Sequence, residues 1–211
     1  MAKENFYLIF SLLALTSVSC ASETVPSREE YGCLSGDLIT KELKTDGEVS
    51  GQLKVSNACL NHDPDSKTPG QTMPGSINMV FCLPGLAPCG QASQEQKIYL
   101  NVVLPKMNFA TSLVKGTKEK DRLIGQEGGL DFYQNEQTGV ISRIPSNGDI
   151  YSVSCWGSNN EICDSVGLTA HNIQYSARTY NPPESIDWQA LHDNIRDFME
   201  TAANIKSPLH H

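Results

Sequence analysis

The chain has 211 residues, of which 39% are hydrophobic and 19% are charged, and 16 Lys and Arg against 24 Asp and Glu give a net charge of −8. This composition excludes collagen-like, low-complexity and highly charged disordered chains, and the acidic balance argues against a general nucleic-acid-binding protein. The length is sufficient for one domain with a sizeable core or for two small ones. The seven cysteines form an odd set that has to be explained.

Residues 1–19 are predicted to form a signal peptide. A short segment with one Lys precedes an apolar or small stretch of 13 residues, Phe6–Val18 (FYLIFSLLALTSV). A membrane-spanning helix needs about 20 apolar residues, so this stretch is too short to cross a bilayer and is typical of a secretory signal. A buried first helix is the alternative interpretation.

The sequence Ser17-Val18-Ser19-Cys20 resembles the lipobox of bacterial lipoproteins, in which a small residue precedes a cysteine that is lipidated and becomes the mature N-terminus. The resemblance implies lipidation of Cys20. It also implies an outer-membrane anchor facing the periplasm, because Ala21 stands where an Asp would retain a lipoprotein at the inner membrane. Stable anchoring takes more than one acyl chain, which a triacylated cysteine supplies. Ordinary signal cleavage after Ala21 is the alternative, and it also removes Cys20.

The mature chain is predicted to contain a tether and one folded domain. Residues 21–30 are polar and prone to turns, so residues 20–35 are assigned to a lipid-anchor tether that holds the folded part off the membrane. Residues 36–211 are assigned to a single domain.

Six cysteines remain after processing, and an even set in an exported protein predicts three disulfides. Proximity in the sequence favours the pairs Cys82–Cys89 and Cys155–Cys163, which leaves Cys33–Cys59. Zinc sites are disfavoured because their cysteines usually lie two to four residues apart, and redox catalysis is disfavoured because the chain has no Cys-x-x-Cys pair.

Short extended segments predict a mainly antiparallel β-sheet. Segments 38–43 and 52–55 flank Asp46-Gly47, which is a hairpin signal. Further strands are expected at 77–83, 97–104, 130–133, 139–144, 150–156 and 172–179. Segment 61–74 is expected to be a long surface loop, and segment 106–120 fits a strand or an irregular crossover.

Segment 184–203 is predicted to form one long amphipathic helix, with Ser185 as its N-cap. Its apolar stripe consists of Trp188, Leu191, Ile195, Phe198, Met199 and Ala202. His192, beside Asp193, is expected on the exposed flank of this helix. The predicted fold class is therefore α+β: a mainly antiparallel sheet with one long C-terminal helix packed on it, stapled by disulfides.

The chain carries no nucleophile elbow, Walker loop, zinc-protease helix or dinucleotide fingerprint. His62–Ser66 (HDPDS) gathers oxygen ligands but lacks the spacing of an EF-hand loop, so a solvated turn is favoured over a calcium site. We therefore expect a protein that is not an enzyme and has no metal site and no cofactor. A secreted hydrolase with a site assembled from distant segments is an alternative.

The last third of the chain carries an ordered set of small motifs: GLDFYQ at 129–134, Thr138-Gly139, IYSVSCWGSNNEIC at 150–163, the strand 173–179 and DWQALH at 187–192. This set resembles the tail of periplasmic immunity proteins of the type VI secretion system. In that family a strand ends in a Cys, a short hairpin returns a second Cys, a strand with a Tyr follows, and a Trp opens a terminal helix.

The resemblance implies a periplasmic protein, often a lipoprotein, that binds and inhibits an antibacterial toxin effector. Such a protein needs a complementary surface rather than catalytic residues, and acidic charge would steer a basic toxin toward it. The candidate partner-binding residues are Asp63, Asp65, Trp156, Asn159, Asn160 and Glu161. Each has a plainer interpretation as a packed aromatic or a solvated polar group. The alternative function is a structural or accessory envelope lipoprotein without enzymatic activity.

The lipidation of Cys20 leads to a first prediction. Replacing the acyl-bearing thiol in Cys20→Ala is expected to move the exported protein from the membrane fraction to the soluble periplasmic fraction, because the acyl chains supply the anchor. Fractionation of cells followed by immunoblotting measures this shift, and unchanged membrane retention would refute lipidation.

Overall fold

The computed structural model describes residues 32–61, 75–83, 86–89, 97–157, 160–183 and 186–205. The predicted signal peptide, Cys20 and most of the predicted tether lie outside these residues, as does most of the expected loop 61–74. Within the described segments, no helix is long and apolar enough to cross a membrane.

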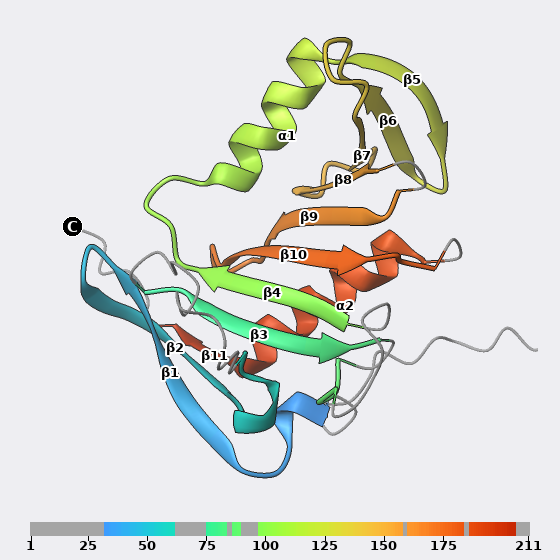
Figure 1. Ribbon diagram of the computed structural model, residues 1–211. Helices are drawn as coiled ribbons and strands as arrows, with labels where there is room; N and C mark the ends of the chain where they lie inside the picture. Colours follow the sequence, from blue (N-terminus) through green and yellow to red (C-terminus); the bar gives the residue numbers. More distant parts are fainter. Residues whose placement is uncertain are drawn as a thin grey trace, which may run out of the picture.

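A large antiparallel sheet forms the centre of the molecule (Figure 1). Its eight strands follow the spatial order β3-β4-β10-β9-β8-β7-β6-β5. Their bounds are β3 Ile77–Cys82, β4 Lys97–Val103, β5 Arg122–Glu127, β6 Leu130–Gln134, β7 Ile141–Pro145, β8 Tyr151–Trp156, β9 Ile162–Leu168 and β10 Gln174–Tyr180. The strands from β5 to β10 follow one another as neighbours, whereas β3 and β4 come earlier in the chain and extend the sheet beyond β10. The antiparallel α+β class predicted from the sequence is confirmed.

A second sheet of three strands has the order β1-β2-β11. The predicted hairpin is confirmed: β1 (Leu38–Thr45) and β2 (Glu48–Ser56) pair across Asp46 and Gly47, whose φ angles of 56° and 86° are those that the sequence Asp-Gly adopts in tight hairpins. The third strand, β11 (Ala203–Ile205), follows the C-terminal helix without a break and pairs with β2. The small sheet is thereby fixed to the end of that helix.

The C-terminal helix α2 spans Trp188–Ala202, a shorter range than predicted. Its N-cap is Asp187 rather than Ser185, because the Asp187 carboxylate accepts a hydrogen bond from the Ala190 amide at 3.0 Å. The predicted stripe is otherwise confirmed: Leu191, Ile195, Phe198, Met199 and Ala202 are buried, and Trp188 is half-buried against two apolar clusters. These side chains form one core with the small sheet and with β3, β4 and β10.

A second helix, α1 (Phe109–Lys120), corrects the expectation of a strand or crossover and of a single long helix. The Asn108 side chain caps it by accepting a hydrogen bond from the Thr111 amide at 3.0 Å. Lys118 and Lys120 in the last turn stabilise the helix because their positive charges interact favourably with the negative end of the helix dipole. The Ala110 amide donates a hydrogen bond to the side chain of Gln174 in β10.

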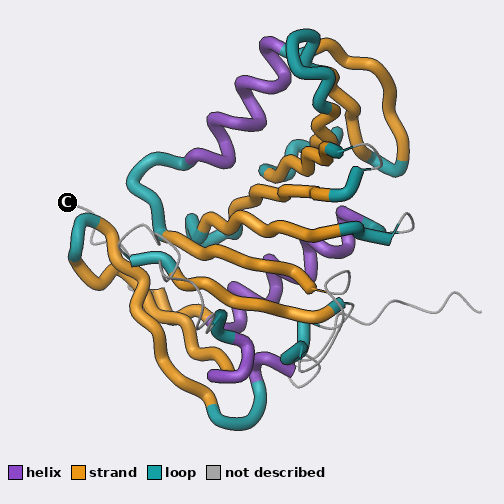
Figure 2. Tube along the Cα trace, viewed as in Figure 1, coloured by secondary structure: helices purple, strands orange, loops and turns teal. Residues whose placement is uncertain are grey.

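The two helices lie on opposite faces of the large sheet. Gln174, which contacts α1, precedes Tyr175, whose hydroxyl contacts His192 of α2, and successive side chains of a strand point to opposite faces. Figures 1 and 2 show α1 standing over the β7–β9 part of the sheet and α2 crossing behind β3, β4 and β10. Among the described residues, no helix covers the other face of β3 and β4, and α1 reaches that face of β10 only at Gln174.

The structure joins Cys33 to Cys59, Cys82 to Cys89 and Cys155 to Cys163, which are the pairs that spacing favours. The first bridge links the short 3-10 helices η2 (Gly32–Leu34) and η3 (Asn57–Cys59), and the third joins directly opposed residues of β8 and β9. Cys33 and Leu34 are buried in the core, so the folded domain includes residues that the sequence assigned to the tether.

Replacing a core side chain of α2 tests this architecture. Phe198 is fully buried and meets Phe81 of β3 edge-to-face, with the ring centroids 4.9 Å apart. Phe198→Ala is expected to lower the free energy of unfolding by about 3–5 kcal/mol, because it leaves a cavity between helix and sheet. Urea denaturation measures the loss. The control is Phe109→Ala on α1, where the ring is 56% exposed and a change below about 0.5 kcal/mol is expected. Equal effects at the two positions would contradict the core.

Candidate functional site

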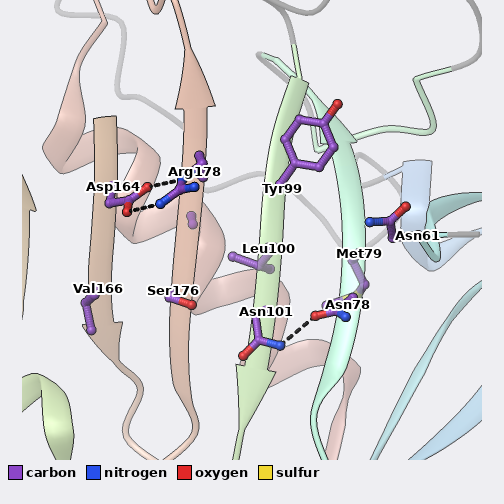
Figure 3. A pocket seen from close by; sticks show the side chains of 11 residues that line it. Asn61, Asn78, Met79, Tyr99, Leu100, Asn101, Asp164, Val166, Ser176 and Arg178 are labelled. Atoms are coloured by element: carbon purple, nitrogen blue, oxygen red, sulfur yellow. Dashed lines mark hydrogen bonds and ion pairs between the residues drawn. The ribbon is translucent and has the colours of Figure 1, made fainter. Parts of the chain in front are cut away.

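The face of the large sheet opposite α2 carries the best-formed group of polar and aromatic side chains. We call this surface, formed by β3, β4, β10, β9 and the end of β8, the open face. Alternation within the strands places Arg178 of β10 on it, directly opposite Tyr99 of β4 on one side and Asp164 of β9 on the other. Figure 3 shows these three side chains on adjacent strands.

An ion pair holds Arg178 in place. Its Nε and Nη2 each donate a hydrogen bond of 2.7 Å to the two carboxylate oxygens of Asp164, a bidentate arrangement. The hydrogen bond to Asp164 is the main cause that raises the pKa of Arg178 above its ordinary value, so the guanidinium stays charged. The guanidinium also lies over the ring of Trp156, 5.8 Å from its centroid. The side chains of Arg178 and Asp164 remain 47% and 31% exposed, so they can meet a partner.

Aromatic and amide groups extend the open face toward β3. Tyr99 and Tyr180 meet edge-to-face with centroids 5.8 Å apart, and Asn101 donates a 2.5 Å hydrogen bond to the side-chain oxygen of Asn78. Between these groups lies a shallow cavity of about 290 Å³. Trp, Tyr and Arg are the residue types that most often anchor protein–protein interfaces, which makes the open face a candidate contact surface.

The sequence-predicted residues are distributed unevenly over this surface. Trp156 lies on the open face beside Arg178, and Asn160 and Glu161 are exposed in the turn that joins β8 to β9. Asn159, Asp63 and Asp65 lie outside the described residues, although Asn61, the last described residue before that segment, lines the cavity. No motif in the sequence pointed to Arg178, Asp164, Tyr99 or Tyr180. The alternation of polar and apolar residues in β10 was the only signal that could have placed Arg178 on a surface.

The second group of titratable side chains is buried under α2, and it corrects the prediction for His192. This residue is only 3% exposed, it shares a hydrogen bond through Nδ1 with the hydroxyl of Tyr175, and its ring stacks on Tyr151 at a centroid distance of 4.3 Å. Tyr175 lies across Gly167, where any larger side chain would overlap the phenol ring. The Tyr151 hydroxyl donates a 2.9 Å hydrogen bond to Gln189.

Burial sets the charge of this group. It lowers the pKa of His192 to about 4, with a further contribution from Arg196, and it raises the pKa values of Tyr151 and Tyr175 above that of a free phenol. All three side chains are therefore neutral near pH 7 and enclosed by protein. They stabilise the contact between α2 and the sheet rather than offering a nucleophile or base to a substrate.

In the described segments, no group of three or more His, Cys, Asp or Glu side chains is arranged to hold a metal ion. The three disulfides fit an oxidising compartment, as expected for an exported protein.

No protein-family model matches the chain, and no curated protein matches its sequence. Among solved structures, the fold is similar to that of Smlt3025, described as an immunity protein of the Stenotrophomonas maltophilia type IV secretion system. The TM-score is 0.56 and the sequence identity 13%, and the match covers 79% of this chain and 93% of that chain. The two chains therefore share a fold.

The buried histidine makes the stability of the protein depend on pH. Its folded pKa of about 4 lies below the ordinary value of 6.5, so the unfolded chain binds a proton more readily. The stability contributed by neutral His192 is complete above about pH 6.5 and is lost as the pH falls toward 4, by about 3 kcal/mol in total. Urea denaturation at pH 7 and pH 4.5 is expected to show a smaller difference for His192→Gln than for the parent protein. The control His171→Gln changes an exposed residue and should leave the difference unchanged. An unaltered pH dependence in His192→Gln would contradict the buried, neutral state.

Proposed function

We propose that the protein is an exported, immunity-type lipoprotein that binds a protein toxin through its open face and blocks it. The fold shared with a secretion-system immunity protein carries this proposal. The lipobox-like sequence at Cys20, the disulfides and the motif set in residues 129–200 support it independently.

The open face suits this function because its anchor residues are held in place before a partner arrives. Asp164 fixes the guanidinium of Arg178, and the Cys155–Cys163 bridge ties together the two strands that carry Trp156 and Asp164. Little side-chain entropy is then lost on binding, so more of the interaction energy appears as affinity. A preorganised Arg and aromatic pair is typical of the residues that contribute most to an interface.

Inhibition of this kind requires no chemistry from the inhibitor. An interface of about 1,600 Å² is sufficient to cover a toxin's substrate site, provided that its central contacts are well packed. We therefore propose that the protein is not an enzyme, which agrees with the enclosed, neutral state of the His192 group.

The type of secretion system that delivers the toxin is less well defined than the immunity-protein class. The motif set in the last third of the chain predicts a type VI effector, whereas Smlt3025 is described as belonging to a type IV secretion system. The fold similarity supports the immunity-protein class without favouring type VI. An outer-membrane anchor at Cys20 is part of the proposal, because it would hold the inhibitor in the compartment that a delivered toxin enters.

The proposal predicts which side chains dominate binding. The probe is the purified product of the reading frame adjacent to this gene, titrated calorimetrically with the disulfide-bonded domain. Trp156→Ala and Arg178→Ala are each expected to weaken binding by about 2 kcal/mol or more, a factor of about 30, because they remove the central aromatic and guanidinium contacts. Lys54→Ala, an exposed change on the small sheet, is the matched control and should bind like the parent protein.

Circular dichroism melting shows whether each variant remains folded. If Trp156→Ala and Arg178→Ala both bind with the affinity of the parent protein, the interface lies elsewhere on the protein. If the protein neither binds that product nor protects cells that express it in the periplasm, the proposed function fails. Stable co-purification with envelope components instead would favour the structural or accessory lipoprotein.

A further inference from the structure

Exposed apolar side chains are concentrated around α1. Among the described residues, the four large hydrophobic side chains that are exposed are Met107 (81%), Phe109 (56%), Leu123 (51%) and Ile124 (43%). The first two lie at the start of α1, and the other two lie in β5 just after its end. Large apolar side chains are therefore exposed at both ends of α1.

The same segment carries positive charge in an acidic protein. Residues 106–122 contain five Lys and Arg and two Asp and Glu, although the whole chain has a net charge of −8. Lys106 pairs with Asp46, Lys115 with Glu119 at 3.8 Å and Arg122 with Glu136 at 3.7 Å. Lys118 and Lys120 are exposed, and neither forms an ion pair with a described carboxylate. Their charge is therefore available to a partner.

A groove runs between α1 and the turn that joins β6 to β7. Its lining includes Phe109, Leu113, Gly116 and Lys120 along the helix and Val140 on the opposite side, and its volume is about 530 Å³. A Cβ added at Gly116 would meet nothing within 4 Å, so the backbone of α1 lies open at the middle of the groove. We call these five residues the α1 groove. Its floor is apolar, and Lys120 stands at one end of it beside Asp121, whose carboxylate accepts a 2.8 Å hydrogen bond from Asn135. Lys118, two positions from Lys120, lies on the other side of α1 and adds positive charge outside the groove.

The α1 groove lies far from the point at which the chain enters the folded domain. In Figure 1, η2 is the blue segment at the lower end of the molecule, whereas α1 and β5 stand at the upper end. Figure 2 shows the same separation. A tether that leads from the membrane to η2 would leave room for the α1 groove to face away from the bilayer.

We propose that the α1 groove is a second docking surface for the toxin, taking an acidic segment with an apolar side chain at its centre. This inference rests on the proposed function and adds the chemistry of one part of the partner. The acidic segment is attracted by Lys118 and Lys120 before contact, and its apolar side chain enters between Phe109, Leu113 and Val140. The groove shape and its distance from η2 favour a protein segment over a lipid surface.

Lys118 and Lys120 should affect the rate at which the toxin associates more than the final affinity. Stopped-flow mixing with the adjacent-frame product at low ionic strength is expected to show association about tenfold slower for Lys118→Glu/Lys120→Glu than for the parent. The deficit should shrink as salt is added. Lys41→Glu/Lys54→Glu is the matched control: it makes the same change in net charge at two exposed positions of the small sheet and should slow association far less.

The apolar part of the groove has its own variant. Phe109→Ser removes the exposed ring at the start of the groove and is expected to increase the dissociation rate at least fivefold, because the acidic segment loses its apolar contact. If Lys118→Glu/Lys120→Glu and Lys41→Glu/Lys54→Glu slow association equally, the effect comes from net charge alone and the inference is overturned. Unchanged dissociation for Phe109→Ser would overturn it as well.

The outcomes separate this inference from the proposed function. Normal binding by all α1-groove variants, with loss of binding in Arg178→Ala, overturns the second surface and leaves the immunity function intact. If the parent protein does not bind the adjacent-frame product, both the second docking surface and the proposed function are wrong. Flotation of the acyl-free domain with vesicles of phosphatidylethanolamine and phosphatidylglycerol tests the lipid alternative, and binding that Lys118→Glu/Lys120→Glu abolishes would replace the toxin with the membrane as the partner.

Discussion

The packing of α2 against one face of the large sheet determines which surfaces of this protein remain available to a partner. The helix buries its apolar stripe against β3, β4 and β10, and Phe198 meets Phe81 at the centre of that contact. β11 then continues from the helix into the small sheet, so the two sheets and the helix share one core. Because the helix and the small sheet cover one face, most of the polar side chains of β3 and β4, together with Arg178 of β10, are presented on the other.

Titratable side chains are neutral on one face of the sheet and charged on the other. Between α2 and the sheet, His192 and Tyr175 share a hydrogen bond and remain neutral. The neutral form has the lower free energy for a titratable group enclosed by protein, because a charge there would lose its hydration. On the open face, Arg178 and Asp164 keep their charges, because each is hydrogen-bonded to the other and still partly hydrated. A surface ion pair of this kind contributes little to stability. In the proposed function, this ion pair holds the guanidinium of Arg178 in a fixed position over the indole of Trp156.

Much of the fold could be predicted from local sequence, whereas the candidate site could not. Asp46-Gly47 specified a hairpin and the stripe of α2 specified a buried helix because each signal lies within one element. α1 was missed because Gly116 and the β-branched Thr111, Val114 and Thr117 weaken its helical pattern, and tertiary contacts decide its structure. β9 was missed because its Asp, Ser and Gly residues are uncommon in strands.

The open face depends on register between strands rather than on any local motif. Arg178 and Asp164 are 14 positions apart in the chain, and Tyr99 joins them only because β4, which comes much earlier, pairs with β10. Trp156 was singled out from its place on the bridged hairpin, and the structure places it at one edge of the open face. The α1 groove required a helix that the sequence did not indicate, so its basic and apolar residues had no common position until the structure placed them.

Site-specific photo-crosslinking tests the central claim, that the open face contacts the toxin. A p-benzoyl-phenylalanine residue is introduced in place of Tyr99 on the open face or in place of Lys41 on the small sheet. Each protein is irradiated with the adjacent-frame product, and the crosslinked peptides are identified by mass spectrometry. If the open face contacts the toxin, a defined toxin peptide is joined to position 99, and little or no product comes from position 41. A crosslink from position 41 with none from position 99 would contradict that claim.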